Sequence, residues 1–220
     1  MANRKAPYSL LYEDEDILVV YKERDVFSIR TKAKNTFSHN LYHYLREYLL
    51  RKGESLFIVH RLDYETSGIM IFAKKREIQI LLQKAFEEHQ VERLYEAVIQ
   101  ERIPLGSKYH VDQYLKDISY RSVICKKDEG KEAITDILAS NYIQIGTALD
   151  IKIETGRHNQ IRVALASLGF TLLGDKRYSH NENKRLYLNA YSLSFPASLP
   201  LKRFSFSLPP LWLDRKVEAL

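Results

Sequence analysis

The nine residues HRLDYETSG at positions 60–68 gather a histidine, an arginine, two carboxylates and two aliphatic hydroxyls directly before the apolar run IMIFAKK. Asp63 therefore stands at the mouth of an expected strand, where a carboxylate can reach a cleft while rigid neighbours hold it. Such a carboxylate can act as a nucleophile or as a general base. The same residues could instead form an Asx- or Thr-type turn that only starts the strand. The local pattern leaves both interpretations open.

A second cluster of polar residues, ETGRHNQIRVALASLG, occupies positions 154–169 and contains Arg157 and Arg162. If residues 158–169 form a helix, Arg162 lies more than one turn from its start. Ile161 and Val163 flank Arg162, which indicates that its guanidinium is partly buried. A buried guanidinium needs a carboxylate partner, and arginine suits such a pair because it stays charged. Two solvated surface arginines are the alternative.

The sequence lacks the patterns that bind nucleotide cofactors or metals. It has no G-x-G-x-x-G and no P-loop, and none of its eight glycines cluster after a strand. His39 and His43 lie four residues apart without the order H-E-x-x-H. Cys125 is the single cysteine, so it forms no internal disulfide and no structural zinc set. We expect Cys125 to be a packed or edge thiol, and we expect no metal and no cofactor.

The composition suits one catalytic domain over residues 1–220 with an anionic partner. Hydrophobic residues make up 45% of the chain, and the net charge is +6. Basic residues cluster among fifteen tyrosines, which can stack on unpaired bases. Nucleic acid is one interpretation of this pattern, and ordinary solvated charge is the other. No stretch is apolar enough to span a bilayer and no signal peptide is evident, so we expect a cytoplasmic protein without membrane contact.

The expected elements form an α+β fold with a mixed or antiparallel sheet, because strands outnumber helices and no regular βαβ alternation appears. Helices are predicted over residues 37–51, with Asn35 or Thr36 as the cap, and over 77–90 and 158–169. Strands are predicted over residues 16–22, 69–75, 93–100, 131–140, 146–156, 185–195 and 202–208.

Five segments together resemble, in order and spacing, the ribosomal large subunit pseudouridine synthase family of the RluA type. They are HRLDYETSGIMIFAKK, RLYEAVIQ, GKEAITDIL, ETGRHNQIRVALASLGFTLLGDKRYS and LYLNAYSLSFPAS. The resemblance runs from about Leu11 to about Phe206. It implies the pseudouridine synthase fold, which is a mixed, largely antiparallel sheet with flanking helices and a central RNA-binding cleft.

The resemblance implies a catalytic set of Asp63, Tyr95 and Arg162. The reaction breaks the C1′–N1 bond of a uridine, turns the uracil and forms a C1′–C5 bond, so it needs no redox change and no cofactor. Asp63 must be ionised, and an arginine partner at position 162 would lower its pKa. Its role as nucleophile or as base stays open. Tyr95 can stack on the uracil, and its hydroxyl could serve in removal of the C5 proton.

The substrate implied by the resemblance is a uridine in structured ribosomal or transfer RNA, flipped out of its helix into the cleft. The residues expected to bind it are His60, Arg61, Thr66, Arg157, Asn159 and Gln160. We expect a monomer without the N-terminal S4-type module that many relatives carry. A non-catalytic RNA-binding or RNA-folding protein on the same fold is the alternative, although such a protein has little reason to keep all three catalytic residues.

The chain departs from the family pattern at three places. The segment YKERD at 21–25 stands where relatives read NKPAG, and Asn159 and Asn189 stand where relatives have histidines. We hypothesise that the two asparagines face each other near the floor of the cleft and form a hydrogen-bonded brace that never charges. Two independent replacements are the alternative.

Overall fold

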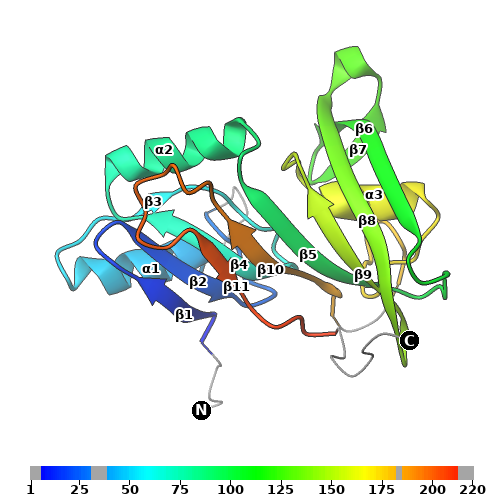
Figure 1. Cartoon of the computed structure of the whole chain (residues 1–220), viewed down its shortest axis with the longest axis horizontal. Helices are drawn as coiled ribbons and strands as arrows, with labels where there is room; N and C mark the ends of the chain where they lie inside the picture. Colours follow the sequence, from blue (N-terminus) through cyan, green and yellow to red (C-terminus); the bar gives the residue numbers. More distant parts are fainter. Residues whose placement is uncertain (1–5, 31–38, 182–184, 213–220) are drawn as a thin grey trace. The chain divides into compact units, whose positions relative to one another are not determined.

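The computed structural model describes residues 6–30, 39–181 and 185–212, which fall into two compact units (Figure 1). Unit 1 consists of Met1–Val91 and Ser194–Phe206, and unit 2 consists of Glu92–Leu193 and Ser207–Leu220. The chain thus passes from unit 1 into unit 2, returns to unit 1 at Ser194 and enters unit 2 again at Ser207. The assignment of residues 1–220 to one catalytic domain stays a prediction.

Unit 1 is built on a small antiparallel sheet. Its strands are β1 (Tyr8–Glu13), β2 (Ile17–Lys22), β3 (Phe57–Ile58) and β4 (Ser67–Ala73). β2 pairs with both β1 and β4, and Lys22 at the end of β2 lies opposite Gly68 at the start of β4. β2 and β4 are buried almost throughout, which explains why their sequences are apolar without alternation.

Two helices flank the sheet of unit 1. Helix α1 (Leu41–Leu50) buries Leu41, Leu45 and Leu49, and α2 (Arg76–Glu87) likewise turns an apolar stripe inward. The side chain of Asn40 accepts a hydrogen bond from His43 N at 2.9 Å and caps α1. The helix therefore begins at residue 41, so the prediction of a start at 37 is wrong. The predicted caps Asn35 and Thr36 lie outside the described residues.

Unit 2 contains a larger sheet with the strand order β10-β5-β9-β8-β6-β7. The strands are β5 (Glu92–Ile99), β6 (Lys108–Ile118), β7 (Arg121–Cys125), β8 (Lys131–Ile143), β9 (Gly146–Ile153) and β10 (Leu188–Ser194). Neighbours from β5 to β7 are antiparallel. A single 3₁₀ turn, Lys127–Glu129, joins β7 to β8. A short strand, β11 (Ser205–Ser207), follows β10 and belongs to unit 1 except for its last residue.

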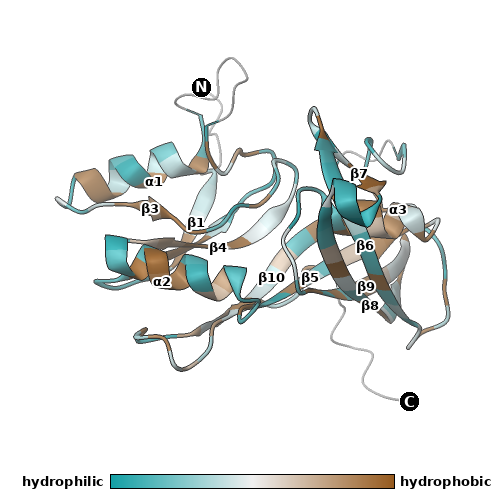
Figure 2. Cartoon of the chain, turned by 90° about the horizontal axis from the view of Figure 1, so that it is seen from above, coloured by the Kyte–Doolittle hydropathy of each residue, from teal (hydrophilic) through white to brown (hydrophobic). Residues whose placement is uncertain are grey.

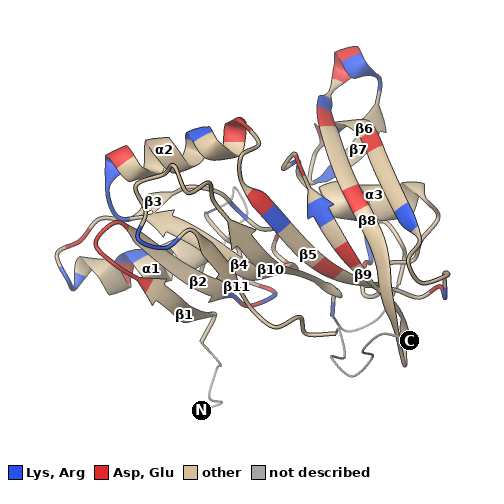
Figure 3. Ribbon diagram, in the orientation of Figure 1, with Lys and Arg blue, Asp and Glu red and all other residues tan. Residues whose placement is uncertain are grey.

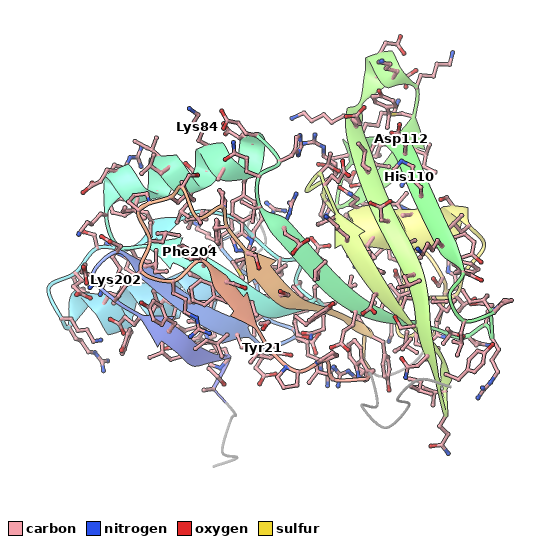
Figure 4. All side chains as sticks on the ribbon, in the orientation of Figure 1. Tyr21, Lys84, His110, Asp112, Lys202 and Phe204 are labelled. Carbon is pink, nitrogen blue, oxygen red and sulfur yellow. The ribbon has the colours of Figure 1, made fainter. Side chains whose placement is uncertain are left out.

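Helix α3 (Gln160–Ser167) covers one face of the sheet in unit 2. Its Ile161, Ala164 and Leu165 pack with Ile137 and Ile151 in one hydrophobic cluster. Figure 2 shows hydrophilic and hydrophobic residues in turn along the strands of this sheet. On β6, His110 and Asp112 are exposed on the face away from α3 (Figure 4). Basic and acidic residues are interspersed along these strands (Figure 3), so the positive net charge does not form a uniformly basic face there.

The observed elements confirm the expected α+β class, with three α-helices among the described residues and a largely antiparallel arrangement. The strands β1 and β6 were not predicted from the sequence. Helix α3 begins at 160 rather than 158, and α2 ends at 87 rather than 90. No helix in the described part of the chain is long and apolar enough to cross a membrane. The central RNA-binding cleft stays a prediction.

Candidate active site

Asp63 lies in the loop between β3 and β4 and is half-buried. The residues on both sides of it are hydrogen-bonded to the segment 26–28. Ser28 Oγ donates to Leu62 O at 2.6 Å and accepts from Leu62 N at 3.1 Å. Val26 N donates to Tyr64 O at 3.3 Å. The backbone on either side of the carboxylate is therefore fixed, while the carboxylate keeps access to solvent.

The buried side chain of Lys22 also holds the loop that carries Asp63. Its side chain is fully buried, and its Nζ donates to the carbonyl oxygens of Glu23 at 3.0 Å, Val26 at 2.8 Å and Tyr64 at 3.2 Å. Burial lowers the pKa of Lys22 to about 7, whereas the nearby charge of Asp63 acts in the opposite direction. Lys22 was not predicted from the sequence as part of the site. The feature of the sequence that could have indicated it is a lysine at the end of the apolar strand β2.

The other predicted residues of unit 1 differ in their surroundings. His60 Nε2 accepts a hydrogen bond from Ile71 N at 3.1 Å, and its ring stacks on Phe86 with the centroids 4.9 Å apart. These contacts attach the loop to β4 and α2. Arg61 is exposed, and Thr66 is buried. Arg61 is therefore the residue of this group whose charged side chain is exposed to solvent.

In unit 2, Tyr95 lies on β5 opposite Ile151 of β9. It is half-buried and packs against the hydrophobic cluster beneath α3. Arg93, two residues earlier and on the same face of the strand, donates from Nη2 to the carbonyl oxygen of Glu154. Tyr95 is thus held by a central strand and retains an accessible part of its side chain.

Gln160 organises the turn that leads into α3. Its Oε1 accepts hydrogen bonds from Thr155 Oγ1 at 2.8 Å and Arg157 N at 2.9 Å. Its Nε2 donates to Ile134 O at 2.9 Å and Thr135 Oγ1 at 3.0 Å. These four hydrogen bonds use the full capacity of one amide. Gln160 therefore fixes the backbone that carries Arg157, whose Nε donates to Glu132 O at 2.7 Å.

Arg162 forms a bidentate ion pair with Asp175. The distances are 2.9 Å from Nε to Oδ2 and 2.7 Å from Nη2 to Oδ1, and the two side chains are 1% and 0% exposed. Burial acts to raise the pKa of Asp175, but the hydrogen bond and charge of Arg162, with two backbone N–H groups, outweigh it and lower that pKa. The expected burial of Arg162 against a carboxylate is confirmed.

Asp175 is a partner that the sequence analysis did not name, although it is the nearest carboxylate after the helix, in the segment GDKR. The expected pairing of Arg162 with Asp63 stays a prediction, because Asp63 belongs to unit 1 and Arg162 to unit 2. A site that contains both Asp63 and Tyr95 also stays a prediction, because Tyr95 belongs to unit 2.

The hypothesis that Asn159 and Asn189 brace each other is wrong. Asn159 Oδ1 accepts from Arg177 Nη1 at 3.0 Å and Tyr178 OH at 3.1 Å, at the start of α3. Asn189 Nδ2 donates to Glu96 Oε1 at 2.8 Å. The neighbour of Asn189 in β10, Leu188, packs in the cluster beneath α3, so strand alternation turns Asn189 to the opposite face of the sheet. The two departures need separate explanations.

Cys125 matches the expectation of a packed or edge thiol. It ends the edge strand β7, is half-buried and donates from Sγ to Tyr114 O at 3.4 Å. Within the described ranges, no three histidine, cysteine, aspartate or glutamate side chains gather in a way that could hold a metal ion.

Comparisons with known proteins identify relatives of this chain by sequence. Residues 16–167 match the sequence model of the family described as RNA pseudouridylate synthase. The chain is 35% identical over 179 residues to ribosomal large subunit pseudouridine synthase D of Vibrio cholerae, and 33% identical over 178 residues to the protein of that name from Escherichia coli K12. Each match covers 78% of this chain but only 53% and 52% of the relative, so the chain spans about half the length of these relatives.

Two solved human structures share the fold. Human RNA pseudouridylate synthase domain containing 1 superposes with a TM-score of 0.73 and 22% identity, covering 95% of this chain and 86% of that one. Human RNA pseudouridylate synthase domain containing 4 gives a TM-score of 0.70 and 20% identity, covering 92% and 88%. At these identities the likeness supports the fold and not the substrate.

Proposed function

The chain belongs to the RNA pseudouridylate synthase family, and from this premise we propose that it isomerises uridine to pseudouridine in structured RNA. The C1′–N1 bond of a flipped uridine breaks, the uracil turns, and a C1′–C5 bond forms. The C5 proton then leaves and N1 takes up a proton, so atoms and electrons balance without a co-reactant. Asp63 is the catalytic carboxylate.

The observation that carries the proposal is the bracing of the Asp63 loop on both sides. Leu62 and Tyr64 are each bonded to the segment 26–28, and Lys22 holds the Tyr64 carbonyl from beneath. A reaction that turns a base within one pocket requires its carboxylate to keep a fixed position, because misplacement by about 1 Å can cost a hundredfold in rate. An Asx-type turn that only starts a strand would not need this support.

Tyr95 and Arg162 complete the proposed catalytic set. Tyr95 stacks on the uracil, and its hydroxyl serves in removal of the C5 proton. Arg162 belongs to the proposed set through the family resemblance, and its buried pair with Asp175 holds its guanidinium in a fixed position.

The proposed substrate is ribosomal RNA, because the relatives are named for the large ribosomal subunit, and transfer RNA is the second candidate. Arg61 and Arg157 supply charge for phosphate contacts. His60, Thr66, Asn159 and Gln160 shape the binding surface, with Gln160 acting through the position of Arg157. We propose that a monomer performs the reaction.

Release of tritium from RNA that contains [5-³H]uridine tests the proposal. The substrate is total RNA from a strain that lacks this protein, since only such RNA keeps the target unmodified. Wild-type protein should release tritium, and sequencing should locate a pseudouridine that is absent from the strain. RNA binding without tritium release would instead support a non-catalytic RNA-binding protein.

A further inference from the structure

The turn between β6 and β7 presents an unusually exposed aromatic side chain. Ser119 and Tyr120 form this turn, and Ser119 adopts a positive φ of 57°. Tyr120 is 73% exposed, more than any other large hydrophobic side chain reported as exposed in the described part of the chain. Neither the fold of unit 2 nor the proposed catalytic set uses this ring.

The turn is nevertheless held firmly. Arg177 Nη1 donates to Tyr120 O at 3.0 Å, and the guanidinium carbon lies 5.7 Å from the centroid of the Tyr120 ring. Tyr178 OH accepts from Ser122 N at 2.8 Å. Tyr120 is thus an anchored aromatic group, and an anchored group loses little conformational freedom when a ligand stacks on it.

Two arginines lie against the aromatic side chains at this turn. Arg177 lies over Tyr120, and Arg121 lies over the neighbouring Tyr178 with 5.3 Å from its guanidinium carbon to the ring centroid. Aromatic faces flanked by arginines are the usual means by which proteins hold unpaired nucleotides, because the base stacks and the cations bind the phosphates. An apolar protein partner would not call for these charges.

The same residues connect the turn to the start of α3. Arg177 and Tyr178 both donate side-chain hydrogen bonds to Asn159 Oδ1. Their backbone N–H groups donate to Asp175 Oδ1 at 2.9 and 3.1 Å, and Asp175 is the partner of Arg162. The exposed turn and the buried ion pair therefore belong to one hydrogen-bonded network.

We propose that Tyr120 and Arg121 bind an unpaired nucleotide of the RNA substrate, separate from the flipped uridine. The base stacks on Tyr120, Arg121 binds its phosphate, and Arg177 positions the ring. The inference rests on the proposed function in one respect, since it assumes an RNA partner. The inference also assigns a role to Asn159, because its Oδ1 accepts hydrogen bonds from Arg177 and Tyr178, which hold the turn.

The test compares Tyr120→Ala with Tyr120→Phe and with Tyr142→Ala. Tyr142 is a matched control: it is also exposed and lies under a guanidinium, with Arg102 at 5.2 Å, but at the end of β8. Tritium release from total RNA of the deletion strain is followed at varied enzyme concentration. Tyr120→Ala should raise the concentration for half-maximal rate roughly 5- to 150-fold, the range for loss of one stacked base. The maximal rate should change by less than about twofold.

Tyr120→Phe should restore wild-type behaviour, and Tyr142→Ala should resemble wild type. If Tyr120→Ala matches Tyr142→Ala, the inference is overturned and the turn is open to a protein partner instead. Tyr120 makes no side-chain contribution to the core, so Tyr120→Ala should keep the wild-type melting temperature. A lower melting temperature that accounts for the weaker RNA binding would also contradict the proposal.

A second measurement does not depend on catalysis. The chain has one tryptophan, Trp212, so Tyr120→Trp adds a fluorophore at the turn. The same RNA should quench the added fluorescence by stacking. If wild-type protein releases no tritium but the quenching occurs, the proposed function fails while the inference stands. Unchanged fluorescence on saturation with RNA would overturn the inference even in an active enzyme.

Discussion

Arg162 and Asp175 form a buried bidentate ion pair that joins α3 to the segment after it. Both side chains are removed from solvent, so each charge depends on the other for compensation. Asp175 also accepts the N–H groups of Arg177 and Tyr178, and it thereby fixes the residues that hold the β6–β7 turn. One carboxylate thus supports both a proposed catalytic arginine and a proposed RNA contact.

Replacement of Arg162 by methionine should strongly destabilise the protein, because it leaves Asp175 charged and buried without its partner. The expected loss in free energy of unfolding is about 3–5 kcal/mol, measured by urea denaturation. Arg162→Lys should lose less, since it keeps the charge but not the two-pronged geometry. A loss below about 1 kcal/mol for Arg162→Met would contradict the account, because that is the range of exposed pairs.

Asp175 should make stability depend on pH in acid. Its pKa is lower in the folded than in the unfolded chain, so its contribution is fully present above the unfolded pKa and is lost as the pH falls through the folded pKa. Wild type should therefore lose stability more steeply than Asp175→Asn below about pH 4. Parallel acid profiles for the two proteins would refute this assignment.

Asp63→Asn should abolish turnover and leave folding intact, because Ser28 and Val26 hold the backbone on either side of residue 63 and the substitution keeps the size of the side chain. Tritium release should fall at least about a thousandfold, as expected for an essential nucleophile or base. RNA affinity and melting temperature are the controls. Residual activity well above that level would remove Asp63 from the catalytic set.

Lys22 should make the free energy of unfolding rise between about pH 7 and pH 10.5. Burial lowers its folded pKa to about 7, so in this window the unfolded chain binds more protons and stability increases with pH. The slope from one such group is at most about 1.4 kcal/mol per pH unit. Lys22→Met, which is unbranched, uncharged and one atom shorter, should flatten the profile. An unchanged slope would show that Lys22 stays protonated in the fold.

Binding to RNA should weaken as salt rises, because phosphate contacts release counterions. Affinity for the deletion-strain RNA, measured between about 50 and 200 mM salt, should give a linear log–log plot. Arg61→Gln should reduce its slope by about one phosphate contact. Tyr120→Ala should lower affinity without changing the slope, since stacking carries no charge. If the affinity of wild type for RNA does not change with salt concentration, phosphate contacts are not the main source of binding.

The sequence by itself determined the elements whose patterns are local. The apolar runs of β2 and β4, the alternation of β9 and the amphipathic stripe of α2 follow from spacing along the chain. Asp63 was found in the same way, as a carboxylate at the edge of a core strand. The strands β1 and β6 were missed because their exposed and partly buried positions carry a weaker pattern.

Only the tertiary structure decided which groups meet. Lys22 gains its carbonyl partner on Tyr64 across 42 positions of sequence, and Asn189 meets Glu96 across 93. Strand alternation placed Asn189 on the face away from α3, which no spacing relative to Asn159 could reveal. The physical reason is that periodicity fixes the direction of a side chain relative to its own element, whereas strand pairing and helix packing decide which element lies opposite.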